Sequence, residues 1–588
     1  MTAPTWDLEA MLPGGLSGQA YRTAYDALSE ELDALVEQAD AVAPLPEGAG
    51  ALVRTFEQLY GLVDRISLVA LFAHCHTCAD TSDRLASSES GRVQTLWDRY
   101  LRAMVPLSDR VASCDDAAFA ALLAQPGTEP MQSALKNIRA RAPLMLPRGE
   151  QALLRELQQD GLGGWSRHYD RVSGRLEVVL GDGQVVSVGR AKNLLSTPDG
   201  AQREMALGAL DRAWGTAADD CAAILTHIVG TRRTLNRRRG VDELADSLSA
   251  NRMRRESLDA MLEAARRAAP LLTRYLDVKA RLLGKEKLGF ADLSAPVGTL
   301  GKMSWASAED FVKTHFDSYH GDLAALARRA FSERWIEAED RDHKRQGGWC
   351  GKVGNPAGVS RIFMTYGETF RSTTTLAHEL GHAFHNWALR DAHPARRAVT
   401  STLAETASIF AENIVRDAAL AAADDRDSRL AMLDARLSAG VSFLMNIPFR
   451  YYLERDLYVQ RAGGDLDPDV LSARTVHFQR QCYSDHLASW YPHFWAEKLH
   501  FYMASRSFYN YPYTFGYLFS SLVYQRARAA GPGYHPQYMA LLERTGWDRA
   551  EPLAQAMLGL DLTDPDAWYG GIEPLEADLA AFEQAAGA

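Results

Sequence analysis

Two histidines four residues apart, with a glutamate directly after the first, stand in the largely apolar run TTTLAHELGHAFHNWAL at 373–389. The run has the pattern of a helix, in which residues four apart lie on one face about one turn from each other. His378 and His382 can therefore present both imidazoles to one zinc ion, a metal that accepts histidine nitrogens. Glu379 lies about a hundred degrees around the helix, where its carboxylate can reach a water bound to that metal.

A catalytic zinc needs a third protein ligand, which we expect from a neighbouring element. The next strong helical pattern, at 401–416, places Glu405 and Glu412 on one face beside an apolar stripe. This stretch is rich in Ala, Ile and Phe, which suits a buried element, and a buried carboxylate must be paired or metal-bound. The sequence favours Glu405 as the third ligand and Glu412 as a hydrogen-bond partner that orients a histidine. A solvated Glu/Ser/Glu face, with two ordinary histidines nearby, is the alternative.

Polar aromatic residues gather in a second stretch, at 499–520. The residues that could donate hydrogen bonds there are His500, Tyr509, Tyr511, Tyr513 and Tyr517. A helix that begins at Pro512 would put Tyr513 and Tyr517 on one face. Such donors could hold the oxyanion that forms when water attacks a peptide carbonyl. An aromatic packing cluster is the alternative interpretation.

HExxH on a helix is the arrangement of zinc proteases, and the surrounding residues make the match more specific. TTTLAHELGHAFH followed by LAETASIFAE resembles the oligoendopeptidase F branch of the thimet oligopeptidase family of zinc metallopeptidases. The match includes Gly381, His385 and the stretch around Glu405. The resemblance implies one Zn²⁺ per chain, Glu379 as the catalytic carboxylate and His385 as a structural or outer-shell residue. The implied zinc ligands are His378, His382 and Glu405.

FGYLFS is similar to the family segment that carries a transition-state-stabilising tyrosine, which implies this role for Tyr517. His500 resembles the histidine upstream of it. As residues that could assist Tyr517 in stabilising the transition state, Tyr509 and Tyr513 rank above Tyr511. GGWCGKVGNP and RIFMTYGETF also resemble the family, in which an edge strand before the motif helix binds the substrate main chain by strand addition. An ordinary turn beside a short strand is the alternative. Gly347 and Gly348 would let a peptide approach closely.

The rest of the sequence predicts a mainly α fold. One buried helical stripe is formed by Leu52, Phe56, Leu59, Val63 and Ile66. Two β-prone runs around Gly181-Asp182-Gly183 predict a hairpin, and 347–370 predicts a small sheet before the motif helix. We expect a zincin-like core with this sheet, embedded in two helical lobes, and the resemblance adds that the lobes enclose a deep channel. The expected domains are 1–200, similar to the oligoendopeptidase F N-terminal region from about 110, and 201–588, the catalytic domain.

Composition bounds the partners and the compartment. The net charge of −11 argues against nucleic acid as a partner. Six cysteines in 588 residues form no disulfide framework, and the N-terminus lacks the features of a signal peptide, so we expect a cytoplasmic protein. The most apolar windows, 66–73 and 441–449, are far shorter than a membrane span, so we expect no membrane partner. The oligomeric state stays open.

These features together predict a zinc-dependent endopeptidase that hydrolyses internal bonds of short unfolded peptides. In that reaction Glu379 activates the zinc-bound water. Two alternatives are a zinc carboxypeptidase of related helical fold and a non-catalytic relative that binds peptides.

Overall fold

The computed structural model describes residues 3–354 and 358–587, which are mostly helical as predicted. The chain forms two compact units, each built from three chain segments. Unit 1 comprises Met1–Ala142, Gly301–Ala418 and Val523–Gly559, and unit 2 comprises Pro143–Leu300, Ala419–Leu522 and Leu560–Ala588. The boundary near residue 200 and the channel stay predictions.

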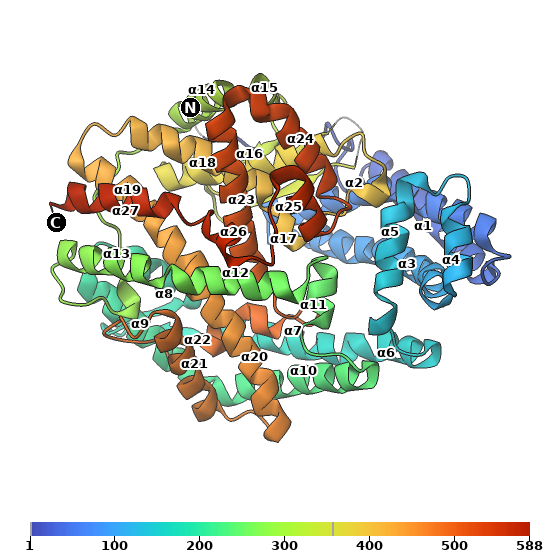
Figure 1. Cartoon of the computed structure of the whole chain (residues 1–588), viewed down its shortest axis with the longest axis horizontal. Coiled ribbons are helices and arrows are strands. Elements are labelled where there is room, and N and C mark those ends of the chain that lie inside the picture. The colour runs from blue at the N-terminus through green and yellow to red at the C-terminus, as the bar shows by residue number, and fades with distance from the viewer. Residues whose placement is uncertain (1–2, 355–357, 588) are drawn as a thin grey trace. The chain divides into compact units, whose positions relative to one another are not determined.

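The elements of unit 1 are long helices at its N-terminal end and a small sheet followed by the motif helix (Figure 1). The α-helices are α1 (Gln19–Ala41), α2 (Ala49–Ala79), α3 (Arg84–Ser113), α4 (Asp116–Leu123), α5 (Gln132–Ala140), α14 (Trp305–Tyr319), α15 (Gly321–Ser332), α16 (Phe370–Ala388), α17 (Ser401–Ala404), α18 (Thr406–Ala421), α24 (His535–Arg544) and α25 (Ala550–Leu558). The strands are β3 (Ile336–Glu337), β4 (Trp349–Lys352) and β5 (Ser360–Phe363).

The three long N-terminal helices pack on one another around a shared apolar core. Four residues of the predicted stripe on α2 are fully buried there: Leu52, Phe56, Leu59 and Ile66. Val63 is only partly buried, and Leu62 takes its place in the core. The helical period of α2 was therefore predicted correctly, except that Leu62 and not Val63 is the core residue on its turn of the helix.

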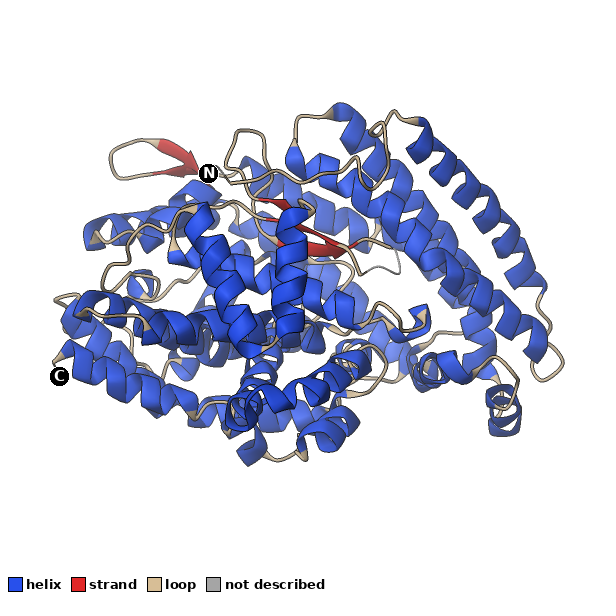
Figure 2. Ribbon diagram, turned by 90° about the horizontal axis from the view of Figure 1, so that it is seen from above, coloured by secondary structure: helices blue, strands red, loops and turns tan. Residues whose placement is uncertain are grey.

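The predicted sheet precedes α16, with the strand order β3-β5-β4 (Figure 2). β4 runs antiparallel to the buried central strand β5 and lies at an edge of the sheet, as expected for a strand that binds a peptide main chain. Successive residues alternate between its two faces. Cys350 lies against Asn386 of α16, whereas the Trp349 ring lies 4.9 Å from the His74 ring of α2. Asn355 and Pro356, at the end of GGWCGKVGNP, lie outside the described residues.

Gly351 and Gly354 let α2 approach the sheet closely. A Cβ at Gly351 would lie 2.4 Å from Leu71 Cδ1, and one at Gly354 would lie 1.6 Å from the backbone oxygen of Asp64. Side chains at these positions would push α2 away from β4. The strand β4 thus lies against α2, and it also contacts the motif helix α16.

Unit 2 is also helical, with one separate β-hairpin. Its α-helices are α6 (Arg148–Asp160), α7 (Leu162–Arg175), α8 (Val188–Asn193), α9 (Gly200–Thr216), α10 (Ala218–Arg239), α11 (Ala245–Ala250), α12 (Arg255–Arg267), α13 (Ala269–Leu282), α19 (Arg426–Val441), α20 (Ile447–Gly463), α21 (Pro468–Cys482), α22 (Phe494–Glu497), α23 (Tyr511–Ala530), α26 (Pro565–Tyr569) and α27 (Pro574–Ala586). The strands β1 (Glu177–Val179) and β2 (Val185–Ser187) form the predicted hairpin, and Gly183 in its turn has a φ of 84°. The dividing positions of the two units at 418/419 and 522/523 fall inside α18 and α23.

Two helical stretches are long and apolar enough to cross a membrane by length and composition alone, Ala49–Ala79 and Arg426–Gly463. They contain the windows 66–73 and 441–449, so the expectation drawn from those short windows does not extend to the whole helices. Core helices of soluble proteins pass the same test, and 39% and 56% of the two apolar stretches are buried within the protein. The absence of a membrane partner stays a prediction.

Candidate metal centre

The predicted motif helix is α16, and its start is fixed by a side-chain cap. Thr369 is the N-cap residue, and its hydroxyl accepts a hydrogen bond from the backbone N–H of Ser372. Nineteen residues of regular helix follow. His378 and His382 therefore stand one turn apart on the same face, with both rings partly exposed.

The structure brings His378, His382 and Glu405 together at the spacing of a zinc site. The two Nε2 atoms lie 3.1 Å apart, and Glu405 Oε2 lies 3.4 Å from His378 Nε2 and 3.5 Å from His382 Nε2. Tetrahedral ligands held about 2.0–2.1 Å from zinc lie about 3.3 Å from one another. The three donor atoms match that separation, so these residues fit the metal in both type and distance.

Gly381 makes this convergence possible because the start of α18 passes directly against α16 at this position. A Cβ at Gly381 would lie 2.5 Å from the backbone oxygen of Ala407 and 2.6 Å from Ser408 Cα. These neighbours are backbone atoms, so a side chain could be accommodated only by separating the two helices. The glycine inside the HELGH motif thus sets the distance between the histidines and Glu405.

Hydrogen bonds orient the donor side chains. Glu412 Oε1 lies 2.6 Å from His378 Nδ1, the contact predicted for Glu412. Arg416, one turn further along α18, forms an ion pair with the other carboxylate oxygen of Glu412. Ser408 Oγ donates to Glu405 Oε2 at 2.7 Å. The sequence analysis missed Arg416, although a glutamate and an arginine four residues apart on a helix commonly pair.

The electrostatics of the centre favour a cation. Burial alone would lower the pKa of His378, but the hydrogen bond to Glu412 and the charges of Glu412, Glu405 and Glu379 raise this pKa to about 9. Burial and the neighbouring His378 lower the pKa of His382. The surrounding carboxylates therefore stabilise positive charge at this centre. A dication would meet the same field.

Glu379 is buried beside the donor atoms. Glu379 is only 5% exposed, and its Oε2 atom is buried with no hydrogen-bond partner among the described residues. Burial raises the pKa of Glu379 to about 7, despite the opposing charge of His378. Gly348 covers this carboxylate, since a Cβ there would lie 3.1 Å from Glu379 Oε1. Gly348 thus faces Glu379, a role that the sequence analysis did not foresee.

The structure breaks the predicted helix 401–416 at Glu405. α17 ends there, α18 begins at Thr406, and the Thr406 hydroxyl donates to the backbone oxygen of Leu403 at 2.7 Å. The break turns Glu405 toward the histidines. His385 does not join them, because its Nε2 lies 2.7 Å from the hydroxyl of Thr545 at the end of α24.

The other predicted site residues lie in unit 2, where they form their own cluster. The rings of His500, Tyr509 and Tyr513 lie within 5.3–5.9 Å of one another. Tyr511 is instead fully buried, and its hydroxyl accepts hydrogen bonds from Ser247 and Asn251. Tyr511 is therefore a packing residue, in keeping with its lower rank.

The side chain of Tyr517 packs against a π-helical turn, Ser442–Asn446. The Tyr517 ring stacks on the Phe443 ring at 4.7 Å, and the Thr514 hydroxyl donates to the backbone oxygen of Phe443 at 2.6 Å. π-helical turns occur frequently at functional sites. Tyr513 and Tyr517 share a face of α23, as predicted, and both side chains are partly exposed.

Comparison with known proteins shows which family the chain resembles. A family profile described as Peptidase family M3 matches residues 311–571, and one described as Oligopeptidase F matches 111–177. Oligopeptidase PepF of Bacillus subtilis (strain 168) is 22% identical over 597 residues, covering 99% of this chain and 86% of that protein. A solved chain of Chlamydophila abortus has a TM-score of 0.83 at 18% identity, covering 99% of this chain and 98% of its own length. Oligoendopeptidase-F from Enterococcus faecium has a TM-score of 0.70 at 19% identity, covering 96% and 99%.

A mainly helical metallopeptidase is the class that this fold and donor set define. The sequence matches then narrow the class further. The chain belongs to peptidase family M3, in its oligoendopeptidase F-like branch, and is a metalloendopeptidase.

Proposed function

We propose that this metallopeptidase is a zinc-dependent endopeptidase that cleaves internal bonds of short unfolded peptides. The observation that carries the proposal is the separation of 3.1–3.5 Å among the donor atoms of His378, His382 and Glu405. Three protein ligands of this kind leave a fourth zinc position for water or substrate, as catalytic sites require.

Zinc held by these residues would polarise the scissile carbonyl and lower the pKa of water. Glu379 is the general base in this proposal. Its buried carboxylate, with a pKa raised to about 7, takes one proton from the attacking water and passes it to the leaving amine as the C–N bond breaks. A base whose pKa lies near the working pH is the efficient choice for both transfers.

Tyr517 and His500 are proposed to hold the oxyanion, assisted by Tyr509 or Tyr513. The stack on Phe443 limits the movement of the Tyr517 ring, and Asn510 Oδ1 lies 2.8 Å from His500 Nδ1, so both side chains are pre-oriented. Burial lowers the pKa of His500. In the neutral ring the one N–H is at Nδ1 and donates to Asn510 Oδ1, so donation from Nε2 to an oxyanion requires the protonated imidazole. Preorganised donors of this kind stabilise a developing negative charge.

The edge strand β4 supports binding of peptides with varied side chains, because strand addition uses backbone hydrogen bonds. Short peptides are the proposed substrates, since they are extended and present their backbone. A cytoplasmic location and the absence of nucleic-acid and membrane partners remain part of the proposal, and the oligomeric state stays open. The carboxypeptidase and non-catalytic alternatives have no support from the family matches.

A quenched fluorescent peptide with both ends blocked tests the function directly. The wild-type protein should cleave it, a chelator should stop cleavage, and zinc should restore it. Glu379→Gln should keep the zinc equivalent held by His378, His382 and Glu405 and lower cleavage about 10²- to 10⁴-fold, the usual contribution of a general base. Cleavage only of peptides with a free carboxyl end would replace endopeptidase by carboxypeptidase action. Undiminished turnover by Glu379→Gln would remove Glu379 from the base role.

A further inference from the structure

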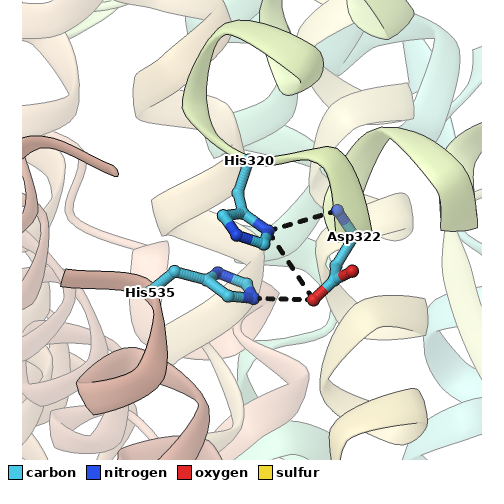
Figure 3. A group of neighbouring side chains, drawn as sticks. All are labelled: His320, Asp322 and His535. Atoms are coloured by element: carbon cyan, nitrogen blue, oxygen red, sulfur yellow. Dashed lines mark hydrogen bonds and ion pairs between the residues drawn. The ribbon is translucent and has the colours of Figure 1, made fainter. Parts of the chain in front are cut away.

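A second group of metal-ligand side chains lies in unit 1, apart from the centre described above (Figure 3). His320 is the N-cap residue of α15, Asp322 follows two residues later, and His535 is the first residue of α24. One nitrogen from each imidazole and one carboxylate oxygen lie within 4.8 Å of one another. Among the residues that the structure describes, only this group and the His378 group have that property.

The three side chains converge on one carboxylate oxygen. Asp322 Oδ2 lies 3.0 Å from His535 Nε2 and 3.6 Å from His320 Nδ1. The two imidazole rings stack in parallel with their centroids 3.5 Å apart. Figure 3 shows the two nitrogens on the same side of the stacked rings, facing Asp322. Two imidazoles and one carboxylate are a donor set that Zn²⁺ and similar divalent metals accept.

The site combines a buried histidine with a partly exposed carboxylate. His535 is only 4% exposed and has Tyr319 and Phe384 as ring neighbours. Asp322, whose side chain is half exposed, supplies the negative charge and leaves an entry path for the ion.

We propose that His320, Asp322 and His535 form a second site for a divalent metal of the zinc class. His320 must turn slightly to bind, since its Nδ1 also accepts the backbone N–H of Asp322 at 3.2 Å as a helix cap. Its side chain is one third exposed and has room to do so. On metal binding, His320 Nδ1 would give up its hydrogen bond from the Asp322 backbone N–H and coordinate the metal instead.

This site is weaker than the His378 site, because it lacks a supporting hydrogen bond. His378 Nδ1 contacts Glu412, whereas His535 Nδ1 is buried with no partner among the described residues. Loss of such a partner typically costs about 10- to 100-fold in metal affinity. Two classes of binding, separated by at least that factor, are therefore expected.

The second site has a structural effect. A metal there ties the start of α15 to the start of α24. The ring of His535 lies 6.2 Å from that of Phe384 on the motif helix α16, and Thr545 after α24 contacts His385 of the same helix. A metal bound at the second site therefore stabilises the packing of α15 and α24 beside α16, without contributing a group to peptide cleavage.

The test is a Zn²⁺ titration of the metal-stripped full chain by calorimetry, with bound metal counted after dialysis. The wild-type protein should bind one tight equivalent and a second about 10- to 100-fold weaker, and the second should raise Tm. Asp322→Asn should lose the weaker equivalent and its effect on Tm, while peptidase activity stays unchanged. The double variant His378→Ala/His382→Ala should lose the tight equivalent and keep the weaker one, even if the proposed peptidase function is wrong.

The matched control is His486→Ala. His486 Nε2 lies 2.7 Å from Asp277 Oδ1, an imidazole–carboxylate pair outside both three-residue groups. This variant should keep both equivalents. Two equivalents retained by both Asp322→Asn and His535→Gln, or one equivalent only in the wild-type protein, would overturn the second site. If His535→Gln fails to fold, Asp322→Asn with His320→Ala decides the question.

Discussion

Gly381→Ala is the substitution that tests the geometry of the metal centre most directly. The new Cβ would lie 2.5 Å from the backbone oxygen of Ala407 and 2.6 Å from Ser408 Cα, both too short for atoms that do not bond. Relief of these contacts requires α16 and α18 to separate by roughly 0.5–1 Å, because neither neighbour is a flexible side chain end.

That separation would lengthen the distances between Glu405 and the two histidine ligands. Glu405 Oε2 already lies 3.4 and 3.5 Å from the two imidazole nitrogens, slightly beyond the separation of about 3.3 Å that tetrahedral zinc sets. Ligand positions must be correct within about 0.2 Å for full affinity. We expect zinc affinity to fall by about 10- to 100-fold or more, and the free energy of unfolding to fall by about 1–3 kcal/mol from overpacking.

Zinc affinity is measured by competition with a chromophoric chelator, and stability by urea denaturation of the metal-free protein. The matched control is Gly61→Ala on α2, where a Cβ meets nothing within 4 Å. This control should leave zinc affinity unchanged and stabilise the protein by about 0.5–1 kcal/mol, as alanine does in a helix interior. Unchanged zinc affinity in Gly381→Ala would refute the view that this helix contact sets the donor distances.

Three further changes test neighbouring groups. Glu412→Gln removes the charged partner of His378 and should weaken zinc binding about 10- to 100-fold in the chelator assay. Gly348→Ala places a Cβ 3.1 Å from Glu379 Oε1 and should lower kcat about tenfold or more at unchanged zinc content, because a displaced base loses alignment. In metal-free protein, Glu379→Gln should gain stability relative to wild type as pH rises from about 4.5 to about 7, by at most about 3 kcal/mol in urea denaturation.

The sign of the pH effect follows from the raised pKa of Glu379. Folded wild-type protein binds the Glu379 proton up to about pH 7, whereas the unfolded chain releases it near 4.5, so this residue destabilises the fold as pH rises through that window. A stability difference between the two proteins that does not change with pH would contradict the buried, unpaired state of the carboxylate. Full zinc affinity in Glu412→Gln would exclude an orienting role for Glu412, and unchanged kcat in Gly348→Ala would exclude contact of Gly348 with the working base.

Local sequence signals predicted much of the fold. The GDG turn predicted the hairpin β1–β2, and the apolar period of 373–389 predicted α16 to within a few residues. Breaks without a local signal could not be predicted. The apolar period continues through Ala217, where α9 and α10 separate, and through Glu405, where α17 ends.

The candidate site was predictable to different depths. His378, His382 and Glu405 converge as predicted because helix spacing and burial constrain them. The contacts of Gly348 and Gly381 depend on which backbone passes beside them, which a single sequence does not contain. The roles of Tyr517 and His500 stay predictions, since they belong to unit 2 and form no part of the donor set.

The interleaving of unit 1 along the chain affects when the enzyme can become active. Its sheet region is held near the beginning by Pro4, whose carbonyl accepts from the backbone N–H of Ala338 at 2.8 Å, and the motif helix is held near the end by Thr545. A ribosome adds these parts hundreds of residues apart, and domains fold as units once complete. Cleavage competence is therefore expected only after the chain has been made through Thr545, well after the HELGH segment itself.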